Sequence, residues 1–194
     1  MSYSLPTSIN VGGVDLRIRG DGDYRIVLDT FSVLDDLTLS KEERLITAVC
    51  LFYDDFNDFT DAITFGHLDE LISNMFKFFN AGKPEQETKS SLKYIDWEDD
   101  SAIICAAVNS VANREIRQDS YLHWWTFMSY YMSIGESVLS TVVAIREKIL
   151  KGKKLESWER KYRMENPQYF KWNSKTADEI ETEQMIFDMW NSGS

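Results

Sequence analysis

The stretch Tyr121-Leu-His-Trp-Trp-Thr-Phe127 holds two Trp, a Phe, a Tyr and a His, and Tyr130 and Tyr131 follow closely. Aromatic side chains bury more apolar surface than any others, so we expect this stretch to form the main packing centre. Apolar residues occur nearly all round a helix from Tyr121 to Ile134, which is typical of an internal helix. The predicted core residues are Trp97, His123, Trp124, Trp125 and Phe127.

His123 is the residue of this stretch whose role is open to two interpretations. Among so many apolar neighbours, the simpler one is a buried imidazole that is hydrogen-bonded to a neighbour. The alternative is a ligand or catalytic role. The chain has only two His in all, which leaves most acid–base and metal mechanisms without partners, so we expect the structural role.

Two further helices are expected around this centre. Acidic residues gather at 96–100 before an apolar run that begins at Ile103, and carboxylates are favoured at the start of a helix. A second apolar stripe runs from Val138 to Leu150 and ends at Gly152, a typical stop signal. Arg146 lies within that stripe and should need a carboxylate partner, for which the candidates are Asp96, Asp99 and Asp100.

Four segments of this half are distinctive together: Asp-Trp-x-Asp-Asp-x-x-Ile at 96–103, His-Trp-Trp-Thr-Phe at 123–127, Thr-Val-Val-Ala-Ile-Arg at 141–146 and Lys-Gly-Lys-Lys-Leu-Glu at 151–156. They resemble the bacteriophage "gene product fifteen" family of the tail modules of phages and prophages of Gram-positive bacteria. The resemblance is strongest from Asp96 to Pro167 and weaker from Ile9 to Phe79. Many members have an aromatic-rich segment where this chain has Asn113-Arg-Glu-Ile-Arg117, which we interpret as a subgroup difference.

This resemblance implies a function through gene order, because members usually lie between the major tail protein and the tape-measure protein. It implies a tail-assembly chaperone that binds the tape-measure protein in the host bacterial cytoplasm, with the major tail protein and a second copy of the chain as further partners. The first alternative is a structural tail component that stays in the virion. The second is a nucleic-acid-binding protein or a carboxylate-dependent enzyme that uses Asp96, Asp99 and Asp100.

The composition of the chain argues against several of these possible functions. The 194 residues are 43% hydrophobic and 13% aromatic, enough for a real core, and no stretch has the roughly 18 apolar residues of a membrane span. Residues 1–100 hold 9 Lys+Arg and 20 Asp+Glu, which argues against duplex DNA or an anionic membrane as the main partner. Neither a phosphate-binding Gly loop nor a Cys-x-x-Cys pair is present, and Cys50 and Cys105 are expected as buried free thiols. We therefore expect a non-enzymatic protein without cofactor or metal.

The N-terminal half predicts a hairpin and acidic helices. Apolar residues alternate on both sides of Gly12-Gly13 between Ile9 and Ile18, which favours a short β-hairpin. Asp23 can cap one helix, Ser40-Lys-Glu-Glu43 is a capping box for the next, and a third helix is expected near residues 60–79. The fold class is therefore mainly α: a multi-helix globular bundle with a short N-terminal β-hairpin.

The predicted domain organisation is a single helical domain over residues 1–175 with a C-terminal tail helix over 176–194. Within the domain, an acidic sub-block at 8–79 and an aromatic sub-block at 96–167 flank a loop at 81–94 that contains Gly82 and Pro84. The tail is amphipathic and suits a partner groove or a neighbouring subunit. Its candidate partner-binding residues are Ile180, Ile186, Phe187 and Trp190, and exposed parts of the helix from Ile63 to Phe79 are a second candidate.

Residues 146–175 carry 10 Lys+Arg and 4 Asp+Glu, interleaved with aromatic residues. Such a mixture can bind single-stranded nucleic acid by stacking. The simpler interpretation is a helix with an aromatic inner edge and a basic outer face. We favour it because the chain lacks the strands of the folds that bind nucleic acid in this way.

Overall fold

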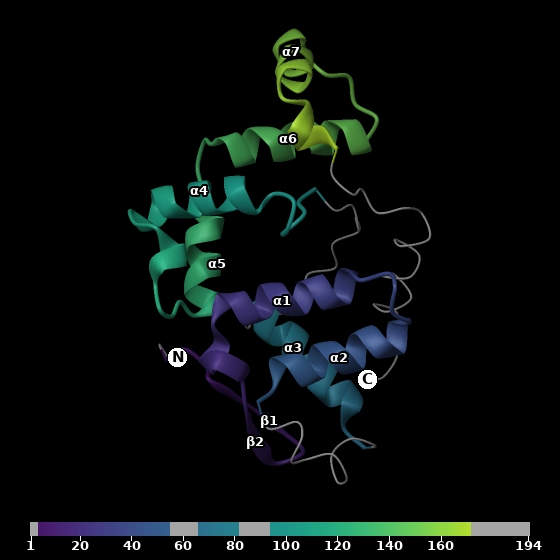
Figure 1. Cartoon of the computed structure of the whole chain (residues 1–194), viewed down its shortest axis with the longest axis vertical. Helices are drawn as coiled ribbons and strands as arrows, with labels where there is room; N and C mark the ends of the chain where they lie inside the picture. The colour runs from purple at the N-terminus through teal and green to yellow at the C-terminus, as the bar shows by residue number, and fades with distance from the viewer. Residues whose placement is uncertain (1–3, 55–65, 82–93, 172–194) are drawn as a thin grey trace. The chain divides into compact units, whose positions relative to one another are not determined.

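The computed structural model of the chain describes residues 4–54, 66–81 and 94–171 (Figure 1). These residues form two compact units. The N-terminal unit comprises the described residues up to 81 together with 119–129, and the C-terminal unit comprises 94–118 and 130–171. The described part holds seven α-helices and a two-stranded antiparallel sheet, so the prediction of a mainly α fold with an N-terminal hairpin is confirmed. None of its helices is long and apolar enough to cross a membrane.

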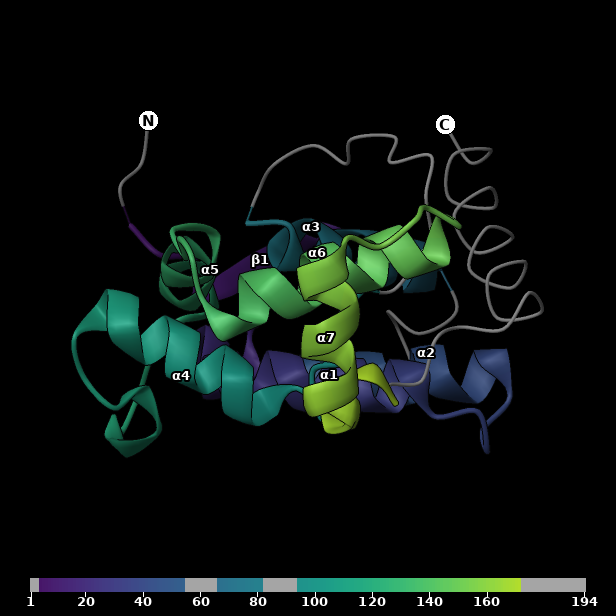
Figure 2. The same cartoon turned by 90° about the horizontal axis from the view of Figure 1, so that it is seen from above.

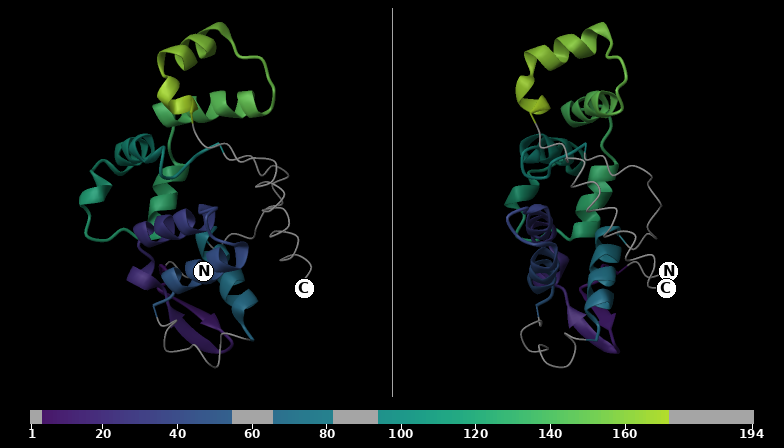
Figure 3. Two further views of the ribbon diagram at one scale, coloured as in Figure 1. Left: turned by 45° about the vertical axis from the view of Figure 1, so that its right-hand side comes forward. Right: turned by 90° about the vertical axis from the view of Figure 1, so that its right-hand side faces the viewer.

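Three helices of the N-terminal unit follow the hairpin. Figure 3 shows α1 and α2 running side by side, with α3 against them. The elements are β1 (Ser8–Val11), β2 (Val14–Arg17), the 3-10 turn η1 (Arg19–Gly22), α1 (Tyr24–Asp35), α2 (Lys41–Phe52) and α3 (Leu68–Phe79).

The hairpin forms where the sequence predicts it. Ile9 pairs with Leu16 and Val11 with Val14, so the two-residue turn is Gly12-Gly13. Both glycines have positive φ angles, 57° and 86°, the backbone that a tight hairpin turn of this kind requires. The turn is tied to α3, because the backbone N–H of Gly12 donates to Glu70 Oε2 at 3.3 Å.

The helix starts of this unit also follow the predicted signals. The Asp23 side chain accepts from the backbone N–H of Arg25, which caps α1. Ser40 and Glu43 form the predicted capping box at the start of α2, with each side chain accepting from the other residue's backbone N–H. Both satisfy donors that a helix start otherwise leaves unpaired.

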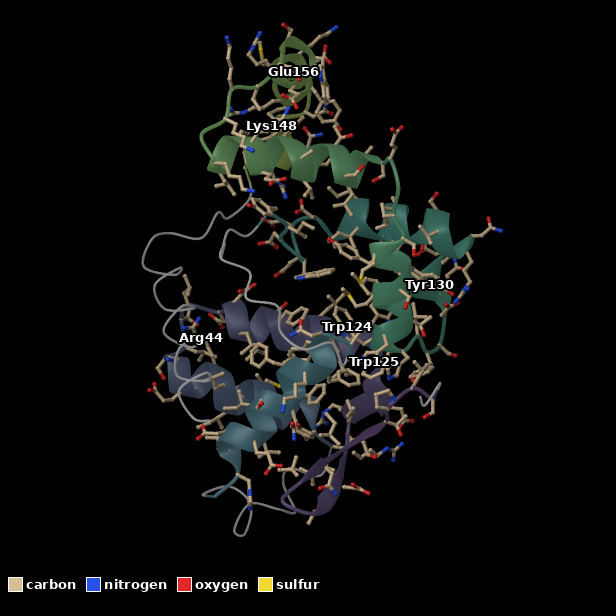
Figure 4. The ribbon with its side chains drawn as sticks, turned by 180° about the vertical axis from the view of Figure 1, so that it is seen from behind. Arg44, Trp124, Trp125, Tyr130, Lys148 and Glu156 are labelled. Atoms are coloured by element: carbon tan, nitrogen blue, oxygen red, sulfur yellow. The ribbon has the colours of Figure 1, made fainter. Side chains whose placement is uncertain are left out.

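The core of the N-terminal unit is built around Trp124 and Phe127, which are 1% exposed and whose rings stack at 5.5 Å. The indole N–H groups of Trp124 and Trp125 donate at 2.9 Å to the carbonyls of Phe79 and Phe78 at the end of α3. The final carbonyls of a helix lack partners within the helix, and the Trp124 bond supplies one to Phe79; Phe78 accepts from Trp125 in addition to the backbone N–H of Ala81. Figure 4 shows both Trp side chains.

The helix predicted over residues 121–134 is shorter than expected: α5 runs from Trp124 to Met132. His123 sets the beginning of α5. Its carbonyl accepts from the backbone N–H groups of Thr126 and Phe127, and its ring Nδ1 accepts from the backbone N–H of Trp125. The preceding backbone is extended, and Leu122 O accepts from Tyr24 N. The expectation of an internal helix is wrong for its C-terminal half, since Met132 is 64% exposed.

Two of the predicted core residues are less buried than expected. Trp125 is half-buried at the edge of the N-terminal unit, and Trp97 is half-buried against Tyr131 in the C-terminal unit, with ring centroids 5.3 Å apart. The physical reason is that an aromatic ring with an N–H group can bury one edge and leave the other in water. Cys50 and Cys105, expected to be buried, are free and only half-buried.

The C-terminal unit consists of three complete helices, the last turn of α5 and two 3-10 turns. Figure 2 shows α7 lying crosswise to α6, and α4 packs against α6. The elements are α4 (Ser101–Ala112), η2 (Ile116–Gln118), the last turn of α5, α6 (Val138–Leu150), α7 (Ser157–Glu165) and η3 (Pro167–Phe170). Gly152, predicted as a stop signal, has a φ of 63° and follows Lys151, the C-cap residue of α6.

Candidate partner-binding surface

The C-terminal unit is held together by Arg146 of α6, which is 1% exposed. Its guanidinium forms a two-pronged ion pair with Asp100 at the start of α4, with Nη2 and Oδ1 2.9 Å apart. It also donates to the carbonyl of Tyr94 at 3.0 Å and to that of Tyr169 at 2.6 and 2.8 Å. One side chain therefore ties α4, α6 and the turn after α7 together.

The three candidate partners of Arg146 make different contacts. Asp100 is 3% exposed and binds the guanidinium, and its Oδ2 also accepts from the backbone N–H of Asp96. Asp96 Oδ1 accepts from the backbone N–H groups of Glu98 and Asp99, which shapes the turn before α4. Asp99 is exposed. The acidic cluster thus combines one buried ion-pair partner with turn-forming residues.

A second buried contact anchors α7 to α6. Glu159 of α7 is 2% exposed and accepts from Lys148 Nζ at 2.6 Å, and its second oxygen accepts from the backbone N–H of Glu156 at 2.8 Å. These bonds lower the pKa of the Glu159 carboxyl, and the bond to Glu159 raises the pKa of the Lys148 ammonium. Both groups therefore stay charged at neutral pH, and the inner face of α7 is fixed.

With its inner face fixed, α7 presents two large apolar side chains to solvent. Trp158 is 54% exposed and Met164 is 81% exposed. Positions three apart are neighbours on a helix surface, so Lys161 lies between them. We define the outer face of α7 by Trp158, Lys161 and Met164. It combines apolar surface with positive charge.

A shallow hollow lies beside this face. Arg160 borders it in a fixed position, since its guanidinium donates to the carbonyl of Leu155 and to Ser157 Oγ. The Trp158 indole N–H donates to Glu156 at 3.1 Å, which orients the ring. The hollow is lined by Lys154, Leu155, Glu156, Ser157, Trp158 and Arg160.

The remaining aromatic residues of the basic segment are less accessible. Tyr162 and Phe170 are half-buried and pack edge to face at 6.4 Å, and Tyr169 is also half-buried. Trp172 lies outside the described residues. Among the described aromatic residues of this segment, Trp158 is therefore the exposed one. This matches a helix with an aromatic inner edge better than a row of stacking rings.

The predicted partner-binding residues Ile180, Ile186, Phe187 and Trp190 lie outside the described residues. The second candidate, exposed parts of the helix from Ile63 to Phe79, presents only polar residues at its exposed positions in the described part. Leu71, Ile72, Met75, Phe78 and Phe79 of α3 are buried, and its exposed positions are polar. Ile63 lies outside the described residues. The strong apolar stripe that suggested a docking face is the side that α3 turns to the core.

His123 is 1% exposed and lies between two backbone groups. Because its Nδ1 accepts from Trp125 N–H, its Nε2 carries the proton and donates to the carbonyl of Pro6 at 3.0 Å. Burial lowers the pKa of this imidazole. Among the described residues, no three His, Cys, Asp or Glu side chains are grouped closely enough to hold a metal ion.

The outer face of α7 was missed as a partner site in the sequence. Its signal was present as a basic segment with interleaved aromatic residues, but the pattern alone does not separate Trp158 from Tyr162. The distinction depends on which side of α7 is fixed by Glu159, and a short helix of mixed pattern does not reveal that.

No curated protein and no solved structure matches this chain. The family described as bacteriophage Gp15 protein matches residues 1–170, which covers every described element. This match spans the acidic half as well as the aromatic half of the sequence, and the chain therefore belongs to the bacteriophage Gp15 protein family.

Proposed function

We propose that this phage protein is a tail-assembly chaperone, which binds the tape-measure protein in the cytoplasm of the host bacterium before the tail tube forms. The major tail protein is a further candidate partner. The observation that carries the proposal is the outer face of α7, where Trp158 and Met164 are exposed on a helix whose inner side is fixed by the ion pair between Glu159 and Lys148. Exposed apolar side chains on a rigid element are suited to binding a partner helix.

The charge distribution supports the same proposal. A chaperone has to keep an aggregation-prone client in solution, and a net charge of −11 favours solubility of the complex. The basic region around α7 sits within this acidic chain and offers a local contact for acidic client segments. The proposal therefore assigns solubility to the acidic surface and binding to α7.

The test is co-expression with the tape-measure protein, followed by pull-down and size exclusion. We expect a soluble complex that is lost when Trp158 and Met164 are both replaced by Ser, and that survives truncation after Lys175. Loss on truncation but not on the double replacement would move the contact to the C-terminal tail. An insoluble, unbound tape-measure protein in every case would contradict the chaperone proposal.

The protein content of purified phage particles distinguishes a chaperone from a structural tail component. A chaperone leaves the tail once the tube has formed, so we expect the chain to be absent from purified virions by mass spectrometry. A fixed number of copies in each particle would instead make it a structural tail component.

A further inference from the structure

We propose that the C-terminal segment 176–194 of this chain docks on the outer face of its own α7 and covers that face while no client is bound. The docking itself does not depend on the proposed function, because it concerns the chain alone. It would make the tail an internal competitor for the surface to which the proposed function assigns the client.

Charge complementarity is the first argument. Residues 151–165, which include all of α7, carry six Lys or Arg and three Asp or Glu. One of the three acids, Glu159, is buried against Lys148 and adds nothing to the outer surface. Residues 176–194 carry five Asp or Glu and no Lys or Arg. The two stretches are thus opposite in charge, and opposite charges attract most strongly where they flank an apolar contact that excludes water.

Apolar surface is the second argument. Trp158 and Met164 are exposed on α7, with Lys161 between them. The tail sequence places Ile180, Ile186, Phe187 and Trp190 among its acidic residues. An amphipathic segment of this composition can bury its apolar side chains against Trp158 and Met164 and bring its carboxylates to Lys154, Lys161 and Arg163, which are exposed. The apolar side chains of the tail would thus cover the apolar side chains of α7, and the tail carboxylates would pair with the basic side chains around them.

Reach is the third argument, and it selects the chain's own tail. The turn η3 ends at Phe170, whose ring packs against Tyr162, and Tyr162 lies one helical turn from Trp158. Residues 172–175 separate the last described residue from the tail, and four residues span up to about 14 Å. A segment tethered by so short a connection has an effective concentration on the order of millimolar at its target, which favours its own copy over a second one.

The test is photo-crosslinking in the full-length chain, with a benzoylphenylalanine in place of Trp158. The replaced side chain is half exposed, so the aromatic substitute fits without disturbing the core. We expect crosslinks from position 158 to residues 176–194 within a single chain, identified by mass spectrometry. The same probe in place of Leu37, which is 62% exposed in the N-terminal unit, is the matched control and should give no tail crosslinks.

A charge variant separates specific docking from chance encounters. Full-length chain with Asp178→Asn, Glu179→Gln, Glu181→Gln and Glu183→Gln should lose at least half of the crosslink yield at position 158. Crosslinks between chains, shown by mixing isotope-labelled and unlabelled protein, would assign the docking to a second copy and overturn the proposal. Absence of tail crosslinks, or a yield unchanged by the charge variant, would also overturn it. None of these three outcomes bears on the capture of the tape-measure protein, so the two proposals are tested separately.

Discussion

Replacement of Arg146 by Met should destabilise the C-terminal unit more than any surface change. Met keeps most of the aliphatic bulk but removes the guanidinium, which leaves the Asp100 carboxylate buried at 3% exposure without its charged partner. It also removes the donors to the carbonyls of Tyr94 and Tyr169. Breaking a buried ion pair from one side costs about 3–5 kcal/mol, a large part of a typical total of roughly 5–15 kcal/mol.

The matched control is Lys161→Met. Lys161 pairs with Glu165 at 3.8 Å on the exposed side of α7, and both side chains are well solvated. Such a surface pair contributes about 0–1 kcal/mol, so its loss should be hardly measurable. Urea unfolding followed by far-UV circular dichroism gives the difference, and hydrogen exchange of residues 157–171 shows whether the region of α7 and η3 loosens first. A loss below about 1 kcal/mol for Arg146→Met would refute the assigned role of the buried pair.

Three further predictions concern the N-terminal unit. Gly22→Ala should lower the free energy of unfolding by about 2 kcal/mol or more, because the φ angle of Gly22 is 82° and the new Cβ would lie 2.9 Å from Phe78 Cζ. Gly13→Ala, where φ is similar and the surrounding space is open, should lower it by only about 1 kcal/mol. Equal urea midpoints for the two variants would contradict this expectation. Trp124→Ala should cost about 3–5 kcal/mol in urea unfolding, and Trp125→Ala, at a half-buried position, clearly less. Burial lowers the pKa of His123 below its ordinary value of 6.5, so the unfolded chain binds more protons than the folded chain once the pH falls below 6.5. The contribution of His123 to the free energy of unfolding is therefore fully present above pH 6.5 and is lost as the pH falls below it. Urea midpoints between pH 7.5 and 5 should show this fall, and the His123→Gln variant should flatten it.

Local signals in the sequence predicted the beginnings and ends of elements well. The Gly12-Gly13 turn and the Ser40 capping box each depend on a few neighbouring residues, and backbone rules determine them almost independently of the rest of the chain. The mainly α fold class follows from the same kind of pattern, and the family resemblance stated from four motifs is confirmed over residues 1–170.

Features that depend on distant contacts were less predictable. Helical spacing from Tyr121 gave a helix that begins too early, because Leu122 pairs with Tyr24, nearly a hundred residues away, and His123 caps the true start. Trp97 and Trp125 are as apolar as Trp124, yet only Trp124 of the three is fully buried. Propensity and pattern describe a side chain, whereas burial depends on which neighbours the fold brings to it.

The candidate site shows the same division. The sequence indicated that Arg146 needs a carboxylate partner and offered three, and the structure places Asp100 there. It did not indicate that Arg146 also binds the carbonyl of Tyr169, since any residue supplies a carbonyl. The exposure of Trp158 depends on the contact between Glu159 and Lys148, which fixes the inner side of α7, and so the binding surface could be identified only once α7 was placed.

Binding of the tape-measure protein to the outer face of α7 is tested by its affinity for the purified protein, determined by isothermal titration calorimetry. We expect that replacing Trp158 and Met164 by Ala raises Kd by about tenfold or more, since central apolar residues dominate such interfaces. Replacing Leu37 and Ile46, which are 62% and 45% exposed in the N-terminal unit, should leave Kd nearly unchanged. Equal affinities for the wild type and the α7 variant, or a larger loss in the Leu37 and Ile46 variant, would show that the tape-measure protein does not bind the outer face of α7.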